Sequence, residues 1–194
     1  MSRIEGMDGR GSRRSLVASI RKRQGEGIFP VVSEIKVRSV KAGDLMRGRD
    51  PVALAREMAG CRVAGISVVT EASHFGGRMD LLRAVAAAVD LPVLHKDFIT
   101  TDEQLEASAA AGATAVLLIS AFLASERIDR LIRSARACGL ETLVEVRSLA
   151  EIERVGHLPF DLMGINNRDI TRYEVDGGDV GRTEALARFG KDHR

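Results

Sequence analysis

The sequence predicts a parallel α/β fold that consists of six strand–helix units behind a leading helix. Short runs rich in β-branched residues alternate with longer amphipathic segments along the 194 residues. The short runs recur every roughly 20 to 35 residues, which is the spacing of a β-α unit. Several of them, such as residues 115–119 (AVLLI), are apolar throughout rather than alternating. Such runs are typical of parallel strands that are covered on both faces.

The expected elements follow one another in a regular order. The six strands are expected at residues 29–36, 65–70, 92–95, 115–119, 142–146 and 161–165. Residues 12–25 read as the leading helix, and residues 183–190 as the last one. The pattern therefore indicates six β-α units behind the leading helix.

Capping residues mark several of the helices between the strands. Asp50 is a typical N-cap, followed by a proline at the first helical position. Thr101 or Asp102 can cap the next clear helix, and Ser148 can begin a shorter one. Gly139 closes the helix of residues 125–137, because glycine tolerates the left-handed conformation that ends many helices.

A closed barrel and an open doubly wound sheet are the two architectures that this order allows. A dinucleotide-binding sheet would carry a glycine-rich turn after its first strand. Here residues 34–39 (EIKVRS) stand in that place. The sequence therefore favours the barrel, with residues 1–194 forming a single domain.

Composition limits the possible partners and the compartment. The net charge of +2 is too close to neutral to favour nucleic-acid binding. Cys61 and Cys138 lie far apart, with no further ligand-type residue at metal spacing, and are expected to be ordinary thiols of a reducing cytosol. No apolar run is long enough for a membrane span, and no secretory signal is visible. A cytoplasmic protein that contacts neither membrane nor nucleic acid is expected.

Charged and amide side chains lie in or directly after four of the six expected strands. The residues are Glu34, Lys36, Lys96, Asp97, Glu145, Asn166 and Arg168. Such groups are costly in apolar strands unless they are paired or functional. Glu34 and Lys36 are two residues apart and so point to the same face of their strand. In a barrel the active site lies at the carboxyl ends of the strands, so the set predicts acid–base chemistry there on an anionic substrate.

Six segments of the chain together resemble the indole-3-glycerol phosphate synthase family. They occur in the family's order between about residues 30 and 186, which spans most of the chain. The segments are 33–36 (SEIK), 66–71 (ISVVTE) with 74–77 (HFGG), 92–99 (PVLHKDFI), 113–119 (ATAVLLI), 143–146 (LVEV) and 164–169 (GINNRD). The resemblance implies a (β/α)8 barrel of the TIM type.

The resemblance also implies a reaction and the roles of six residues. Family members close the indole ring of 1-(2-carboxyphenylamino)-1-deoxyribulose 5-phosphate, a small phosphosugar, with loss of carbon dioxide and water and with no metal or organic cofactor. Lys96 is then the general acid on the substrate carbonyl, and Glu145 its partner in later proton transfers. Lys36 faces the substrate carboxylate and the leaving hydroxyl, while Glu34 holds and tunes Lys36. The remaining two residues, Asn166 and Arg168, organise the polar network.

Substrate-binding residues are expected on the same grounds. Phe75, Phe98 and Leu117 are expected to line the pocket for the anthranilate ring. Ser39 corresponds to a family serine that helps to bind phosphate, although the family's Ser-Pro-Ser is Ser39-Val40-Lys41 here. The leading helix resembles the family's amino-terminal extension and is expected to cap the pocket.

The barrel is expected to be incomplete, because the family's seventh and eighth strand signatures are not in these 194 residues. That leaves the first and sixth strands as open edges, which favour self-association. The sequence predicts reduced activity for this chain by itself. One alternative is a non-catalytic barrel remnant, or a fragment that needs a carboxyl-terminal partner. Another is a phosphoribosylanthranilate isomerase, which would need a cysteine at the end of the first strand, where this chain has none.

Overall fold

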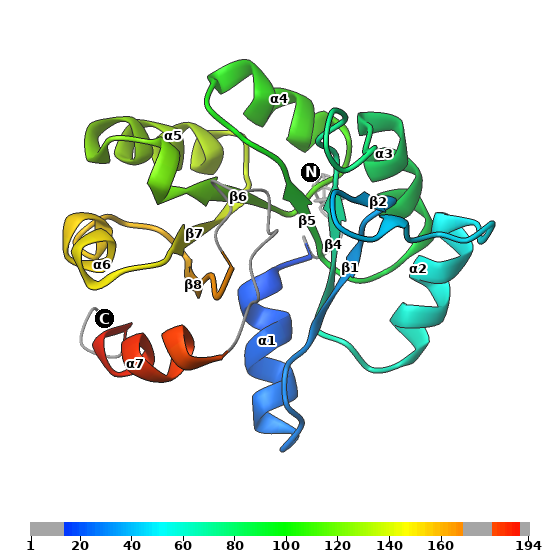
Figure 1. Cartoon of the computed structure of the whole chain (residues 1–194), viewed down its shortest axis with the longest axis horizontal. Coiled ribbons are helices and arrows are strands. Elements are labelled where there is room, and N and C mark those ends of the chain that lie inside the picture. The colour runs from blue at the N-terminus through cyan, green and yellow to red at the C-terminus, as the bar shows by residue number, and fades with distance from the viewer. Residues whose placement is uncertain (1–13, 169–179, 191–194) are drawn as a thin grey trace, which may run out of the picture.

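The computed structural model describes residues 14–168 and 180–190. Its main sheet contains six parallel strands in the order β1-β4-β5-β6-β7-β8. Their bounds are β1 Val32–Ile35, β4 Gly65–Val69, β5 Val93–Lys96, β6 Ala115–Ile119, β7 Glu141–Val146 and β8 Leu162–Ile165. The spatial order follows the chain order, and the sheet curls into a half-barrel (Figure 1). The predicted barrel-type fold of six β-α units with a leading helix is thus confirmed.

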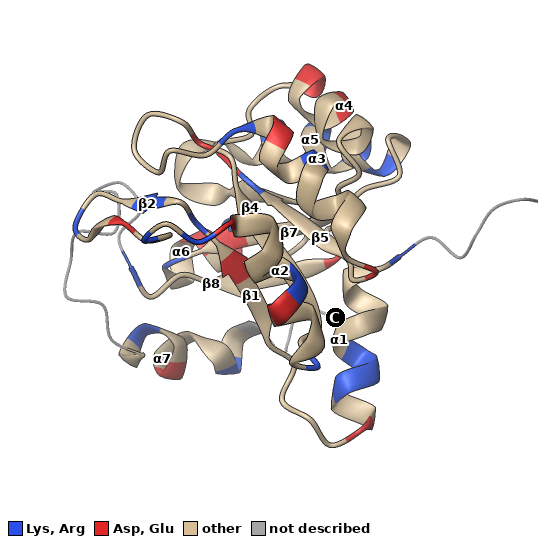
Figure 2. Ribbon diagram, turned by 90° about the vertical axis from the view of Figure 1, so that its right-hand side faces the viewer, with Lys and Arg blue, Asp and Glu red and all other residues tan. Residues whose placement is uncertain are grey.

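The helices after α1 follow the strands and cover the outer, convex face of the curled sheet, whereas α1 lies at its open side (Figure 1). Their bounds are α1 Leu16–Gly25, α2 Pro51–Gly60, α3 Met79–Ala88, α4 Asp102–Ala110, α5 Ser125–Ala137, α6 Leu149–Val155 and α7 Gly181–Gly190, with a 3-10 turn η1 Ser120–Phe122. Basic and acidic residues both occur on helices such as α2 and α7 (Figure 2).

Three of the expected helix signals are confirmed in atomic detail. The Asp50 carboxylate accepts hydrogen bonds from the first backbone N–H groups of α2. Thr101, not Asp102, is the N-cap of α4, and it forms a reciprocal capping box with Gln104. Ser148 is the N-cap of α6, and its hydroxyl accepts a hydrogen bond from Glu151 N.

Other boundaries differ from the expectation. β1 is four residues long rather than eight, and Phe29, expected in the strand, is 84% exposed. The leading helix begins at Leu16 with Ser15 as its N-cap. No capping signal predicts α3, whose N-cap residue Arg78 makes no side-chain capping bond. A small antiparallel hairpin, β2 Arg38–Ser39 with β3 Gly43–Asp44, was also not foreseen.

The apolar core lies between the sheet and the helices, and strand alternation separates it from the barrel interior. In β7, Thr142, Val144 and Val146 are buried, whereas Leu143 and Glu145 are only half-buried on the opposite face. The buried set packs against helices α5 and α6. The alternation therefore directs Glu145 toward the hollow side of the curled sheet.

Helix α1 packs against the amino ends of the strands. Leu16 and Ile20 contact Leu94, Ala115 and the first residues of β1 and β8. The Glu141 carboxylate, at the start of β7, accepts hydrogen bonds from Ser15 Oγ and from Leu16 N at 2.7 Å. The expectation that the leading helix caps the pocket is therefore wrong, because functional side chains lie at the opposite ends of the strands.

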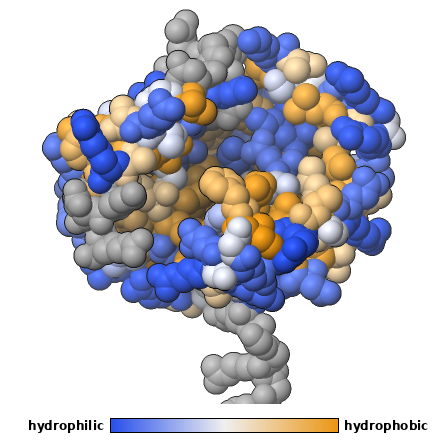
Figure 3. Space-filling model, turned by 90° about the horizontal axis from the view of Figure 1, so that it is seen from below, coloured by the Kyte–Doolittle hydropathy of each residue, from blue (hydrophilic) through white to orange (hydrophobic). Residues whose placement is uncertain are grey.

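The two outer strands of the sheet each have one neighbour among the described residues. β1 pairs only with β4, and β8 pairs only with β7, within residues 14–168 and 180–190. Figure 3 views the molecule from below, on the side of α1 and α7, and shows apolar side chains around a hollow. Unpaired strand edges of this kind favour association with another polypeptide.

We expect Glu141→Ala to destabilise the fold by about 1–3 kcal/mol, because the amino end of α1 loses its buried carboxylate acceptor. Glu153→Ala, at an exposed position on α6, is the matched control and should change stability by less than about 0.5 kcal/mol. Urea denaturation followed by circular dichroism measures both. Equal stabilities for the two variants would contradict the role of Glu141.

Candidate active site

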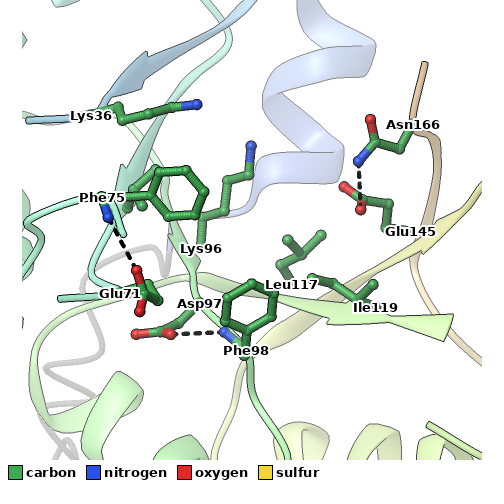
Figure 4. Close-up of a pocket in the computed structure, with 11 residues that line it drawn as sticks. Lys36, Glu71, Phe75, Lys96, Asp97, Phe98, Leu117, Ile119, Glu145 and Asn166 are labelled. Carbon is green, nitrogen blue, oxygen red and sulfur yellow. Dashed lines mark hydrogen bonds between the residues drawn. The ribbon is translucent and has the colours of Figure 1, made fainter. Parts of the chain in front are cut away.

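A pocket lies at the carboxyl ends of the parallel strands. It contains about 380 Å³ of empty space, open solvent at its mouth included. Eleven residues line it: Lys36, Val69, Glu71, Phe75, Lys96, Asp97, Phe98, Leu117, Ile119, Glu145 and Asn166. Figure 4 shows the two lysines on one side of this pocket and the Glu145–Asn166 pair on the other. Seven of the ten residues predicted for the site are thus brought together.

An ion cluster of one carboxylate and two ammonium groups forms one side of the site. Lys96 Nζ donates to Glu34 Oε2 at 2.7 Å, and Lys36 Nζ lies 3.2 Å from Glu34 Oε1. β1 brings Glu34 and Lys36 to the same face, as their spacing predicted, and Lys96 comes from the end of β5. β4 lies between these two strands, so the cluster spans three strands.

The Glu34 carboxylate is held ionised by its two neighbours. Burial is the largest influence on this group and pushes its pKa upward. The charges of Lys96 and Lys36 and their hydrogen bonds outweigh burial, so the pKa of Glu34 is lowered from its ordinary value. Glu34 is therefore a fixed negative charge between two positive groups, which opposes their mutual repulsion.

Glu145 and Asn166 form the opposite side of the site from adjacent strands. Asn166 Nδ2 donates to Glu145 Oε1 at 2.8 Å. The backbone N–H of Asn166 also continues the β8 ladder by donating to Val146 O at 2.9 Å. The position of the Asn166 amide beside the carboxylate is thus fixed by the sheet itself.

Apolar side chains form the floor and walls of the pocket. Phe75 and Leu117 are 5% and 2% exposed, and they pack in one cluster with Val69 and Ile119. Lys36 Nζ lies 5.1 Å from the centre of the Phe75 ring, within the range of a cation–π contact. The partly buried Phe98 completes this cluster. The pocket thus combines a surface for a flat apolar group with charges at its edges.

Ser39 and Arg168 lie beside a neighbouring open cavity rather than in the pocket. This cavity encloses about 1010 Å³, open solvent included, between β1, α2 and the hairpin β2–β3. Glu34 and Lys36 line it too, so it adjoins the ion cluster. Ser39 Oγ accepts a hydrogen bond from Ala42 N at 3.2 Å within the hairpin. Arg49 adds a further positive charge to the cavity wall.

Glu71 lines the pocket although no role was predicted for it, and Asp97, predicted as one of the charged groups at the strand ends, lines it too. Glu71 accepts hydrogen bonds from the backbone N–H groups of Ser73, His74 and Phe75. Burial raises the pKa of Glu71, but these hydrogen bonds outweigh it and the net pKa is lowered. Glu71 therefore fixes the loop that carries Phe75. Its place directly after an apolar strand was the available signal.

The described ranges 14–168 and 180–190 contain neither a metal-ligating cluster nor a membrane-spanning helix. No group of three or more His, Cys, Asp or Glu side chains is arranged there to hold a metal ion. No helix in the same ranges has the length and apolar character that crossing a membrane requires.

Comparison with known proteins gives a consistent family match. The family model described as indole-3-glycerol phosphate synthase matches residues 6–192. The indole-3-glycerol phosphate synthase of Pyrococcus abyssi is 43% identical over 158 residues, which is 81% of this chain and 69% of that protein. That of Halobacterium salinarum is 44% identical over 165 residues, which is 85% of this chain and 64% of that protein.

Solved structures of mandelate oxidase are similar to the chain in fold alone. A mutant with (S)-mandelic acid has a TM-score of 0.56 at 16% identity, over 93% of this chain and 60% of that one. Another structure of the enzyme has a TM-score of 0.52, and the chain spans 52% of its length. These TM-scores support the fold of the chain. At 16% identity the similarity carries nothing about chemistry.

We expect Glu34→Gln to lower stability most strongly above about pH 4.5, the ordinary pKa of the group. A lowered folded-state pKa gives stability that is present above the unfolded-state pKa and is lost as the pH falls through the folded-state value. The difference between wild type and variant should therefore shrink in acid. Urea denaturation between pH values of about 3 and 7 measures it. A difference that does not depend on pH would count against the ionised carboxylate.

Proposed function

The chain belongs to the indole-3-glycerol phosphate synthase family, and we propose that its pocket closes the indole ring of 1-(2-carboxyphenylamino)-1-deoxyribulose 5-phosphate. The observation that carries this proposal is the Glu34 carboxylate held between Lys36 and Lys96, beside a pocket with an apolar floor. Ring closure with loss of carbon dioxide and water makes the protein a carbon–carbon lyase of tryptophan biosynthesis. A flat aromatic acid joined to a phosphosugar has the apolar and anionic parts that this site complements.

The first step is condensation at the substrate ketone. Lys96 donates a proton to the carbonyl oxygen, while the ring carbon that carries the carboxylate attacks the carbonyl carbon. The electron pair of the new bond comes from the aromatic ring, and the ring nitrogen takes the resulting positive charge as an iminium. The carbon–carboxylate bond then breaks, and its electrons neutralise that iminium as carbon dioxide leaves. The proximity of Lys96 to Glu34 at 2.7 Å supports this role by orienting the ammonium group.

The second step is loss of water. Lys36 is proposed to protonate the leaving hydroxyl, and Glu145 to accept the proton that the ring gives up as the indole forms. The proposed acid and base then lie on opposite sides of the substrate. Figure 4 shows the two side chains on opposite sides of the pocket, which supports this arrangement. Asn166 orients Glu145 through their 2.8 Å hydrogen bond.

Substrate binding divides between the pocket and the adjoining cavity. Phe75, Phe98 and Leu117 are proposed to hold the anthranilate ring. Ser39 and Arg168 are proposed to face the polar part of the substrate, because both line the adjoining cavity together with Lys36. The backbone N–H of Arg168 donates to Asn166 Oδ1 at 2.8 Å. This hydrogen bond connects the cavity wall to the amide that is proposed to orient Glu145.

A second candidate function is a barrel fragment that is inactive until a partner supplies further strand–helix units. The observation that favours it is the single neighbour of β1 and of β8 among the described residues. We propose that these edges mediate association, with a second copy of the chain or with such a partner. The cytoplasmic location inferred from the ordinary thiols stays a prediction.

The two candidates are separated by assaying indole formation with this chain alone and with a polypeptide that supplies two further strand–helix units. Turnover by the chain alone, even at a reduced rate, supports the enzyme reading. Turnover only in the mixture supports the fragment reading. No turnover in either case, with the chain folded by circular dichroism, would contradict catalysis by this pocket.

In whichever preparation shows turnover, we expect Lys96→Met to lower kcat at least about a hundredfold, because the general acid is lost. Lys22→Met is the matched control, since Lys22 is exposed on α1 at the opposite end of the strands. The fluorescence of the indole product measures both rates. Wild-type turnover by Lys96→Met would refute the role of Lys96.

A further inference from the structure

A buried hydrogen-bond chain lies directly behind the ion cluster, on the helix side of β5. Its members are Ser108, His95, Thr70 and Asp97, and we refer to them as the His95 chain. Ser108 is 0%, His95 3% and Thr70 4% exposed. None of these three lines the pocket, whereas Asp97 does. The reaction described above uses none of the four residues.

The direction of each hydrogen bond follows from the proton that each group possesses. Ser108 Oγ donates its one proton to Gln104 O at 2.6 Å. It must therefore accept from His95 Nδ1, which lies 2.6 Å away. Thr70 Oγ1 in turn donates to Asp97 Oδ2, and His95 Nε2 lies 2.6 Å from the same hydroxyl. Thr70 Oγ1 therefore joins the His95 ring to the Asp97 carboxylate, and the four side chains form one continuous chain.

Asp97 links the chain to the pocket. Its Oδ1 accepts a hydrogen bond from Phe98 N at 2.7 Å. Burial raises the pKa of Asp97, but the bonds from His95, Thr70 and Phe98 N outweigh it and the net pKa is lowered. The Asp97 carboxylate is therefore the end of the His95 chain that faces the pocket.

The His95 chain holds the backbone that carries two functional side chains, those of Lys96 and Phe98. Thr70 N donates to Lys96 O at 3.1 Å, which joins the ends of β4 and β5 at the proposed general acid. Gln104 Nε2 donates to Phe98 O at 3.2 Å, so both backbone polar groups of Phe98 are engaged. The ring of Phe98 lies at 5.4 Å from that of Phe122 in an edge-to-face contact. A small shift of this backbone would displace the pocket wall and Lys96 together.

We propose that His95 is a positioning residue, which acts through Thr70 and Asp97 to fix the backbone of Lys96 and Phe98 at the pocket. Its effect on turnover rests on the proposed function, whereas its effect on the position of Phe98 does not. The residue acts from the helix side of the strand and does not touch the substrate. Its role is to make the segment after β5 rigid, so that the acid and the aromatic wall keep one geometry.

The test compares Thr70→Ser with Thr70→Val. Valine keeps the shape of threonine and removes the hydroxyl, whereas serine keeps the hydroxyl and removes a methyl group. A threonine that only filled space would tolerate valine better, because serine leaves a small cavity. The proposal predicts the reverse order in activity. Thr70→Ser should keep kcat/KM within about threefold of wild type, and Thr70→Val should lower it about tenfold to a hundredfold.

Thr142 supplies a matched control at the amino end of β7. It is 1% exposed, and its hydroxyl donates to Asp161 Oδ2 at 3.1 Å, so it also joins a buried strand to a carboxylate. Thr142→Val should lower stability about as much as Thr70→Val does and leave KM and kcat unchanged. Equal losses of activity at the two positions, or wild-type activity in Thr70→Val, would overturn the proposal.

Nuclear magnetic resonance gives a readout that does not need turnover. Wild type and Thr70→Ser should show the Phe98 amide signal at the same position. Thr70→Val should shift both the Phe98 amide signal and the ring signals of His95. If wild type has no turnover, these signals still decide about the His95 chain, and only the proposed function fails. Unchanged signals in Thr70→Val would overturn the positioning role.

Discussion

The active site depends on one geometric constraint, the parallel direction of six strands in a curled sheet. Parallel strands end at the same rim, so residues separated by more than a hundred positions in the chain meet there without any long loop. Glu34 from β1 and Glu145 from β7 face one hollow for this reason. The helices that return the chain to the opposite rim also shield the outer face of the sheet. The rim is thus the place where side chains project into open space on a rigid support.

Charge balance is the second condition that this rim satisfies. Two ammonium groups close together would repel each other, and each would lose hydration on burial. Glu34 offsets both costs by accepting from Lys96 and pairing with Lys36. The opposite side is balanced differently, because Glu145 faces the neutral amide of Asn166. The two sides of the site therefore differ in net charge, an arrangement that suits the proposed transfer of protons across a bound substrate.

The sequence predicts this rim well and its supporting contacts poorly. Apolar runs and capping residues located the six strands and most helices, and two-residue spacing correctly put Glu34 and Lys36 on one face. The hairpin β2–β3 could not be predicted, because two-residue strands leave no periodic pattern in the sequence. The docking of α1 depends on contacts with strands far along the chain, which no local signal encodes. The same holds for His95, whose partners Thr70 and Ser108 come from neighbouring elements and are recognisable only once these are packed.

The attachment of α1 bears on the order in which the protein assembles during synthesis. Ser15 and its acceptor Glu141 are 126 positions apart, so this helix is translated long before its anchor exists. Contacts of such high sequence separation form late and slow folding, because a long stretch of chain must be ordered first. On the ribosome, the amino end of α1 cannot reach its carboxylate anchor until β7 has emerged. The helix is therefore fixed at its amino end only after β4, β5 and β6, whose residues it also contacts, have been made.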